Sequence, residues 1–241
     1  MEPNNPPFIN RRILLTGASG LLGANIVMGA PPHWKCIAIT NQHHLQNPPT
    51  GVVSIPADLL SRSLDTVFDQ YLPIDTIIHT VASTNVDQCQ QEPELATPLN
   101  STLTRTVADY AHKHNIHLVH ISTDHIFDGT TGNYAETDRP NPVNVYAETK
   151  LTAEHHITAV HGDRSAIVRT NFFGYNMQPK QDLAGWMCAA LAHGEPIRLF
   201  TDVFFSPILV NTLVSAIVEV ADRQLTGILH IAATDGCSKY E

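Results

Sequence analysis

The sequence predicts an α/β protein built on a parallel, doubly wound sheet. Short apolar runs that are typical of buried parallel strands alternate with segments of helical periodicity. A glycine-rich turn, from Gly17 to Gly23, joins the first of these strands to the first helix. The length of 241 residues suffices for one well-buried core, either as one domain or as a domain with a lobe.

The glycine-rich turn follows the apolar run at 13–15 and precedes a helix that begins at Leu21. Its spacing is G-x-x-G-x-x-G, in which glycine permits a tight turn, a close approach to a pyrophosphate and close packing of the helix on its strand. The helix N-terminus adds free N–H groups. We expect a dinucleotide site rather than a bare turn, formed by Gly17, Ser19, Gly20, Leu21, Leu22 and Gly23.

Two further strands are predicted at 35–40 and 52–55. Residues 41–44, Asn-Gln-His-His, follow the second strand and include neither a carboxylate for a ribose 2′-hydroxyl nor an arginine. This favours NADP over NAD and leaves both open. Asp58, with Leu59 beside it, follows the third strand, where it is placed either to meet the adenine side of the cofactor or to cap the next helix.

The next elements are a helix at 61–72 and a strand at 76–81. That strand ends in small residues that leave room for a cofactor, and the expected contacts are Val81, Ala82 and Ser83. Thr97 and Pro98 supply a plausible N-cap and first-turn proline for a further helix, and a fifth strand is predicted at 116–122.

Composition excludes several classes of partner. A net charge of −9 argues against nucleic acid or an anionic membrane as the main partner.

The four scattered cysteines indicate reduced thiols, and residues 1–10 have the character of a flexible tail without a signal peptide. A cytoplasmic protein is therefore expected. The most apolar segment, 207–220, is too short and too often interrupted to span a bilayer and is predicted to be a core helix.

Histidine is frequent, with 14 residues, and four of these resemble metal ligands in their spacing: His112, His114, His117 and His120. The spacing crosses a predicted helix end and a strand, and no carboxylate or cysteine completes a ligand set. We therefore expect no metal, and composition explains the histidines.

Tyr146 and Lys150 form a Y-x-x-x-K motif, which places both side chains on one face of a helix. There the ammonium is expected to lower the phenol pKa from its usual value of ~10, so that the phenol can donate a proton to a ketone as hydride arrives. The motif alone also fits a solvated helix face. The glycine turn and Ser122-Thr123-Asp124 at the end of the fifth strand favour the catalytic interpretation of the motif.

With these motifs the sequence resembles the extended short-chain dehydrogenase/reductase superfamily, and within it the dTDP-4-dehydrorhamnose reductase group. The resemblance runs from about Arg11 to the last residue. It rests on 16–23, on Leu99-Asn100, on 122–129 (similar to S-T-D-Y-V-F-D-G), on 144–150 (similar to N-V-Y-G-E-T-K) and on Arg169-Thr170.

The resemblance implies a Rossmann-like domain at 11–170 that binds NADP(H) or NAD(H), with Asn100 and Ser122 among the cofactor contacts. It also implies that Thr123 orients the substrate carbonyl and that Tyr146 donates the proton. Lys150 would tune Tyr146 and hold the nicotinamide ribose, and the cofactor would supply the hydride. The expected substrate-binding residues are Thr123, Asp124, Asn171 and Phe172.

The sequence departs from the family at three places. His125 stands where tyrosine is usual, Ala147 replaces a usual glycine, and 202–208 is only loosely similar to Q-x-G-x-P-T. The leading hypothesis is reduction of a 4-keto nucleotide-sugar. The alternatives are an epimerase or dehydratase of the same superfamily, and a non-catalytic regulatory subunit, because the β subunit of methionine adenosyltransferase resembles the same motifs. A homodimer is left open.

Residues 171–241 are expected to form a substrate-binding portion that interleaves with the sheet. A strand is predicted at 227–232, and Ser238 and Glu241 have the spacing of a capping box, which predicts the start of a helix. Since the resembling family continues from a similar point, we expect the substrate lobe to be incomplete and apolar surface near Phe204 and Phe205 to be uncovered.

Overall fold

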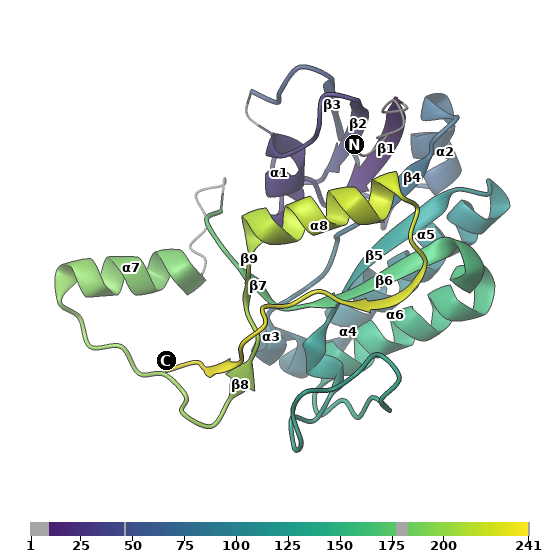
Figure 1. Ribbon diagram of the computed structural model, residues 1–241. Coiled ribbons are helices and arrows are strands. Elements are labelled where there is room, and N and C mark those ends of the chain that lie inside the picture. The colour runs from purple at the N-terminus through teal and green to yellow at the C-terminus, as the bar shows by residue number, and fades with distance from the viewer. Residues whose placement is uncertain (1–9, 46, 177–182, 241) are drawn as a thin grey trace, which may run out of the picture.

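The computed structural model describes residues 10–45, 47–176 and 183–240, and a parallel sheet forms its centre (Figure 1). Seven strands of the described chain lie in the order β10-β6-β5-β4-β1-β2-β3, and every neighbouring pair is parallel. This confirms the predicted α/β class. The strands are β1 (Arg11–Thr16), β2 (Trp34–Thr40), β3 (Val52–Pro56), β4 (Thr76–His79), β5 (His117–Thr123), β6 (Ser165–Thr170) and β10 (Gly227–His230).

Helices cover both faces of the sheet, because successive residues of each buried strand point to opposite faces. Ile13 and Leu15 of β1 belong to the core on the side of α1 (Leu21–Met28) and α8 (Val210–Asp222). Leu14 belongs to the opposite core. That second core is completed by α2 (Leu64–Phe68), α5 (Leu103–Lys113) and α6 (Val145–His161).

Helix α8 is tied to the first strands of the chain although it comes late in the sequence. The Arg11 guanidinium donates to the carbonyl of Asp222, at 2.8 Å. The Trp34 indole N–H donates to the Asp222 carboxylate, at 2.7 Å. Leu213 and Ile217 of α8 are fully buried in the same core as α1. The face of the sheet that carries α1 is therefore closed by a segment from the far end of the chain.

The order of the strands reverses direction at β1. From β1 the chain builds outward through β2 to β3, and it then returns to β4 on the other side of β1 and continues to β5, β6 and β10. In open α/β sheets the crevice at such a switch point, at the carboxyl ends of the strands, is where ligands bind. The glycine turn leaves β1 at this place.

The predicted N-cap at Thr97 is wrong. Thr97 has helical angles (φ −59°, ψ −45°) and ends α4 (Pro93–Thr97), which continues through a π turn, Pro98–Thr102, into α5. Pro93 supplies the first-turn proline instead, and the wider turn accommodates Pro98, which has no N–H to donate. The helix predicted at 61–72 is shorter, since α2 begins at Leu64 and is followed by a 3-10 turn at Asp69–Tyr71.

Beyond residue 170 several short elements lie beside the sheet. Strand β7 (Phe172–Phe173) pairs with β9 (Ile208–Leu209), and β8 (Phe204–Phe205) pairs with β11 (Cys237–Ser238). Helix α7 (Leu183–His193) extends away from the sheet (Figure 1). Phe204 is 71% exposed, in the region where the sequence predicts uncovered apolar surface.

Two predictions fall partly outside the described residues. Ser238 lies in strand β11, and Glu241, its expected partner in a capping box, falls outside the described residues. The predicted tail also lies outside them, except for Asn10. Among the described residues, none of the helices combines the length and the apolar composition that a membrane-spanning segment requires.

A buried ion pair joins the middle of α6 to β6. The Arg169 guanidinium donates through Nη2 to Oε2 of Glu154 at 2.7 Å and through Nε to both carboxylate oxygens. The two side chains are only 4% and 2% exposed. Ser122 of β5 donates to the same carboxylate. One carboxylate therefore connects α6 with two neighbouring strands.

Arg169→Met should destabilise the protein by about 3–5 kcal/mol, because it leaves the Glu154 carboxylate buried without its cation. The matched control is Arg223→Met. Arg223 pairs with Glu219 over the same 2.7 Å, but the side chains are 64% and 60% exposed. Its loss should cost less than about 1 kcal/mol. Urea unfolding measures both, and equal losses would contradict the role assigned to burial.

Candidate active site

The candidate site lies where the loops after β1, β4 and β5 meet. The Thr80 hydroxyl, which follows β4, donates to the carbonyl of Thr16 at 2.8 Å and lies 3.3 Å from the carbonyl of Gly17. The loop after β4 is thereby fixed against the glycine turn after β1. The two loops form one wall at the switch point of the sheet.

The three glycines of the turn are required for different reasons. Gly17 has φ +73°, and a Cβ there would lie 2.7 Å from Oγ1 of Thr80. A Cβ at Gly23 would lie 2.2 Å from the carbonyl oxygen of Gly17, so Gly23 lets α1 pack against the turn. Gly20 has neither constraint, because its φ is −73° and its Cβ would meet one atom at 3.3 Å.

Gly20 is the N-cap of α1, and no side chain among the described residues caps this helix. The first-turn N–H groups of α1 therefore face the crevice without a side-chain acceptor, which suits a phosphate. Ser19 is half-buried beside them, while the Leu22 side chain belongs to the core, so that only its backbone is placed for a ligand. Leu21 is half-buried. This cradle fits a dinucleotide pyrophosphate.

Asn100 shapes the second wall of the crevice. It is fully buried, its Oδ1 accepts from the N–H of Ser83 at 2.7 Å, and its Nδ2 donates to the Ser83 carbonyl and to Oγ1 of Thr149, both at 3.0 Å. Asn100 thus holds the loop containing Val81 and Ala82 against α6, and these two residues are half-buried at the crevice.

Asp58 does not cap the following helix, since α2 has Ser63 as its N-cap. The Asp58 carboxylate instead accepts from the N–H of Leu60 at 3.0 Å. Leu59 contributes its side chain to the core beneath β1 and β4. The alternative of a helix cap is therefore wrong, and Asp58 remains a half-buried carboxylate next to the end of β3.

Tyr146 lies in the first turn of α6 because Asn144 starts that helix. The Asn144 side chain accepts from the N–H of Ala147 at 2.9 Å, as an N-cap does. The side chain of Thr123, the last residue of β5, lies close enough to the Tyr146 phenol to lower its pKa. The structure thus brings these two predicted residues together. The ring of His125 meets the Tyr146 ring edge-on at 5.9 Å between centroids.

Lys150 lies one turn further along the same helix and is fully buried. Its ammonium donates to the Ile121 carbonyl at 2.7 Å and to Nε2 of His120 at 3.1 Å. Burial lowers the pKa of Lys150 to about 8, and the Glu154 carboxylate partly opposes this shift. The ammonium is thus fixed to β5.

The prediction that Lys150 lowers the pKa of Tyr146 is wrong. Burial raises this pKa to about 12, while the nearby Thr123 hydroxyl opposes the rise. The sequence motif places Lys150 on the same helix face, but the partners of its ammonium are Ile121 and His120. In this arrangement the phenol is held firmly in its protonated form.

The residues expected on the substrate side lie beyond Thr123. Asn171 donates to both oxygens of the Asp124 carboxylate, at 3.2 and 3.3 Å. Burial raises the pKa of Asp124. Phe172 is half-buried in β7. Ser122, expected to contact the cofactor, instead turns its hydroxyl toward Glu154 in the interior.

Sequence reasoning missed three residues next to Tyr146 and Lys150. The Cys89 thiol packs in a small buried cluster with Tyr146 and donates to Ser83. His125 stood out only as a departure from the family pattern. Glu154 could have been found, since it follows Lys150 by four residues and therefore continues the face of Tyr146 and Lys150.

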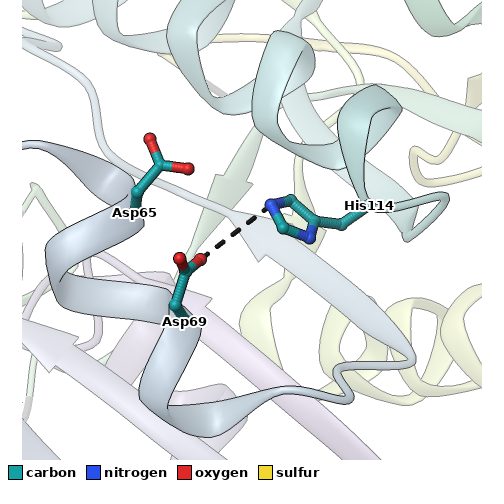
Figure 2. Close-up of side chains that lie close together, drawn as sticks. All are labelled: Asp65, Asp69 and His114. Carbon is teal, nitrogen blue, oxygen red and sulfur yellow. Dashed lines mark ion pairs between the residues drawn. The ribbon is translucent and has the colours of Figure 1, made fainter.

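Figure 2 shows the only group of three metal-ligand side chains found in the described part of the chain: Asp65, Asp69 and His114. The Asp65 carboxylate pairs with Lys113, an interaction that lowers the pKa of Asp65. Asp69 accepts from the Tyr110 hydroxyl at 2.8 Å and lies 3.9 Å from Nε2 of His114. These contacts join α2 to α5 as an ion-pair network, and we assign no metal to them.

The other three histidines that resembled ligands point to separate partners. His117 contacts the Leu225 carbonyl at 2.8 Å, and His112 packs edge-on against His161. His120 accepts from Lys150. The four histidines therefore do not share one site.

Comparison with known proteins identifies a family, several relatives and several solved structures of the same fold. The family model described as "RmlD substrate binding domain" matches residues 11–241. A probable low-salt glycan biosynthesis reductase, Agl14, of Haloferax volcanii is 32% identical over 91% of this chain and 73% of its own length. The β subunit of methionine adenosyltransferase 2 of Bos taurus is 32% identical over 60% of this chain and 42% of its own.

Among solved structures, a dTDP-4-dehydrorhamnose reductase of Bacillus anthracis in complex with NADP superposes with a TM-score of 0.79. It is 27% identical, and the match covers 95% of this chain and 77% of that one. The similarity extends through both the sheet and the segment after residue 170.

Gly23→Ala should destabilise the protein by about 1–3 kcal/mol, because the added methyl group overlaps the Gly17 carbonyl. Gly20→Ala should cost less, about 1 kcal/mol, since its Cβ would lie 3.3 Å from the Gly17 carbonyl oxygen, a tight contact that a small shift relieves, and Gly is preferred to Ala at an N-cap. Urea unfolding without added ligand compares the two. If Gly20→Ala lost more stability than Gly23→Ala, the fold itself would require Gly20. That result would contradict the assignment of Gly20 to a ligand.

Proposed function

Because the chain belongs to the RmlD family of short-chain dehydrogenase/reductase proteins, we propose that it reduces the C4 carbonyl of a 4-keto nucleotide-sugar with NADPH or NADH. The observation that carries the proposal is the meeting of Thr123 and Tyr146 at the end of β5, next to the glycine turn and with Lys150 one helix turn away. The coarser activity, that of an NAD(P)-dependent oxidoreductase, is supported by the dTDP-4-dehydrorhamnose reductases among the relatives and solved structures.

The cofactor would be held by the glycine turn. The open N-terminus of α1 offers N–H groups to the pyrophosphate, and Gly20 permits its close approach. Val81, Ala82 and Ser83 would contact the rest of the dinucleotide, with Asp58 near the adenine. A reduced nicotinamide dinucleotide supplies the hydride for this chemistry.

Tyr146 would act as the general acid. With its pKa raised to about 12, the phenol carries a proton throughout the neutral range. The Thr123 hydroxyl would orient the substrate carbonyl, and the phenol would donate its proton to the carbonyl oxygen. Lys150 would hold the nicotinamide ribose, since its ammonium is fixed to His120 and the Ile121 carbonyl on β5.

The substrate would lie between the end of β5 and the segment that begins at Asn171. Asp124 and Asn171 provide carboxylate and amide groups for sugar hydroxyls, and Phe172 provides an apolar surface. His125 contributes an imidazole beside Tyr146, where the family usually has tyrosine. We propose dTDP-4-dehydrorhamnose as the first substrate to test, because relatives with that activity match most of this chain.

Two other functions remain in competition. An epimerase or dehydratase of the superfamily would recycle its cofactor within one turnover, so release of oxidised cofactor separates it from a reductase. A regulatory subunit is favoured by the match to methionine adenosyltransferase 2 subunit β, which covers 60% of the chain. Co-purification with such a synthetase, and no turnover of ketosugars, would identify that function.

Tyr146→Phe should reduce the rate of NADPH oxidation with an accepted 4-ketosugar by about 10²- to 10⁴-fold, because it removes the proton donor. NADPH affinity should change little. Tyr110→Phe is the control, since it removes the hydroxyl of another buried tyrosine that lies away from the crevice and contacts Asp69. A parent-like rate for Tyr146→Phe would mean that another group is the acid.

Gly20→Val should lower NADPH affinity at least about tenfold in a folded protein, because the side chain occupies the approach to the helix N-terminus. Isothermal titration calorimetry measures the affinity, and circular dichroism confirms the fold. Full affinity in this variant would defeat the assignment of the glycine turn as the pyrophosphate site.

A further inference from the structure

Two buried histidines lie behind the candidate site and have no part in the mechanism above. His79 of β4 and His120 of β5 are both fully buried, and their rings stack with centroids 5.6 Å apart. Neutral imidazole can be placed in a core only if its nitrogens find suitable partners. The hydrogen bonds around the two rings determine which nitrogen of each carries the proton.

His79 is satisfied at both nitrogens. The Thr104 hydroxyl donates to the Asn100 carbonyl at 2.8 Å, so its oxygen accepts from Nε2 of His79 at 3.1 Å. Nδ1 of His79 then accepts from the Thr16 hydroxyl at 2.7 Å. His79 is therefore neutral, and burial lowers its pKa to about 3.

His120 is bound to Lys150. An ammonium group only donates hydrogen bonds, so Nε2 of His120 must accept from Nζ of Lys150 at 3.1 Å, and the ring proton is on Nδ1. Burial and the Lys150 charge both hold the pKa of His120 well below its usual value. Its Nδ1 has no hydrogen-bond partner among the described residues.

We propose that His120 is a positioning residue for Lys150: together with the Ile121 carbonyl, Nε2 of His120 anchors two of the three ammonium N–H groups and keeps this buried group protonated. The third N–H has no acceptor among the described residues. The arrangement itself is independent of any reaction, whereas its importance for catalysis rests on the proposed function.

The other groups around Lys150 do not replace this anchor. The Glu154 carboxylate raises the pKa of Lys150, but its oxygens bind Arg169 and Ser122. Tyr146 of α6 keeps its proton at neutral pH, because burial raises its pKa to about 12. The Cys89 thiol of α3 (Val86–Gln91) donates to Ser83. His79 is neutral and has its own partners. His120 and the Ile121 carbonyl are thus the acceptors that hold Nζ among the described residues.

The test without cofactor is the pH dependence of unfolding. The pKa of Lys150 is about 8 in the folded protein and ~10.4 in an unfolded chain, so the unfolded state binds more protons between these values. The Lys150 contribution to the free energy of unfolding therefore increases as pH rises from about 8 to ~10.4. The onset of that increase reports the folded pKa.

Four variants distinguish the loss of the His120 acceptor from a general loss of packing. In His120→Leu the acceptor is lost, and the onset should move about one pH unit lower. His120→Gln places an amide oxygen near the position of Nε2 and should keep the onset of the parent, whereas His120→Asn is too short and should behave like His120→Leu. His79→Leu removes an equally buried ring and should destabilise the protein without moving the onset.

The Lys150 contribution is isolated by repeating the His120 variants in a Lys150→Met background, where the differences in onset should disappear. His120→Gln and His120→Asn retain a polar side chain and provide the comparison if His120→Leu does not fold. Equal onsets for His120→Gln and His120→Asn, or an equal shift in His79→Leu, would overturn the proposal.

An activity measurement then tests the catalytic consequence. For an accepted ketosugar, the alkaline limb of kcat/KM should move to lower pH in His120→Asn and stay in place in His120→Gln. No turnover by the parent with any ketosugar would defeat the proposed function alone, because the unfolding measurements decide the anchor separately. If all variants turned over the ketosugar and the alkaline limb of kcat/KM lay at the same pH in each, the catalytic role of His120 would be overturned.

Discussion

The burial of a carboxylate in the middle of α6 is the constraint on which the rest of the structure depends. Glu154 has no access to water, so its charge must be matched inside the protein. Arg169 and Ser122 provide that match from two adjacent strands. These contacts fix the rotation of α6 on the sheet, and with it the direction of the Tyr146 and Lys150 side chains.

The same ion pair reaches the loops that surround the crevice. The Arg169 guanidinium lies 5.4 Å from the centre of the Phe127 ring, and the Glu136 carboxylate accepts from the backbone N–H of His230. Phe127 and Tyr134 stack with their rings nearly parallel. The loop between β5 and α6 is thus attached to β10 at the sheet edge, so that the entrance to the crevice and the helix behind it are held by one connected set of contacts.

Much of the fold was predictable because its signals are local. Glycine spacing, apolar runs and the Y-x-x-x-K motif each depend on a few neighbouring residues, and the structure places the corresponding elements as expected. The direction in which the Tyr146 pKa shifts from its ordinary value was not predictable. It depends on how deeply the phenol is buried and on the partners that Lys150 finds on β5, and no spacing within α6 reports either. Likewise, the π turn at Pro98 packs against α6, a contact between distant segments that no local spacing reports.

Helix α8 has a consequence for how the protein must be made. It covers the core face shared with α1, and Asp222 binds both Arg11 and Trp34, yet more than 190 residues separate α8 from β1. During translation the early strands and α1 leave the ribosome long before their cover does, at about 5–20 residues per second. The nascent chain therefore displays an apolar sheet face for many seconds. That interval is when a chaperone would bind it and when misassembly would begin.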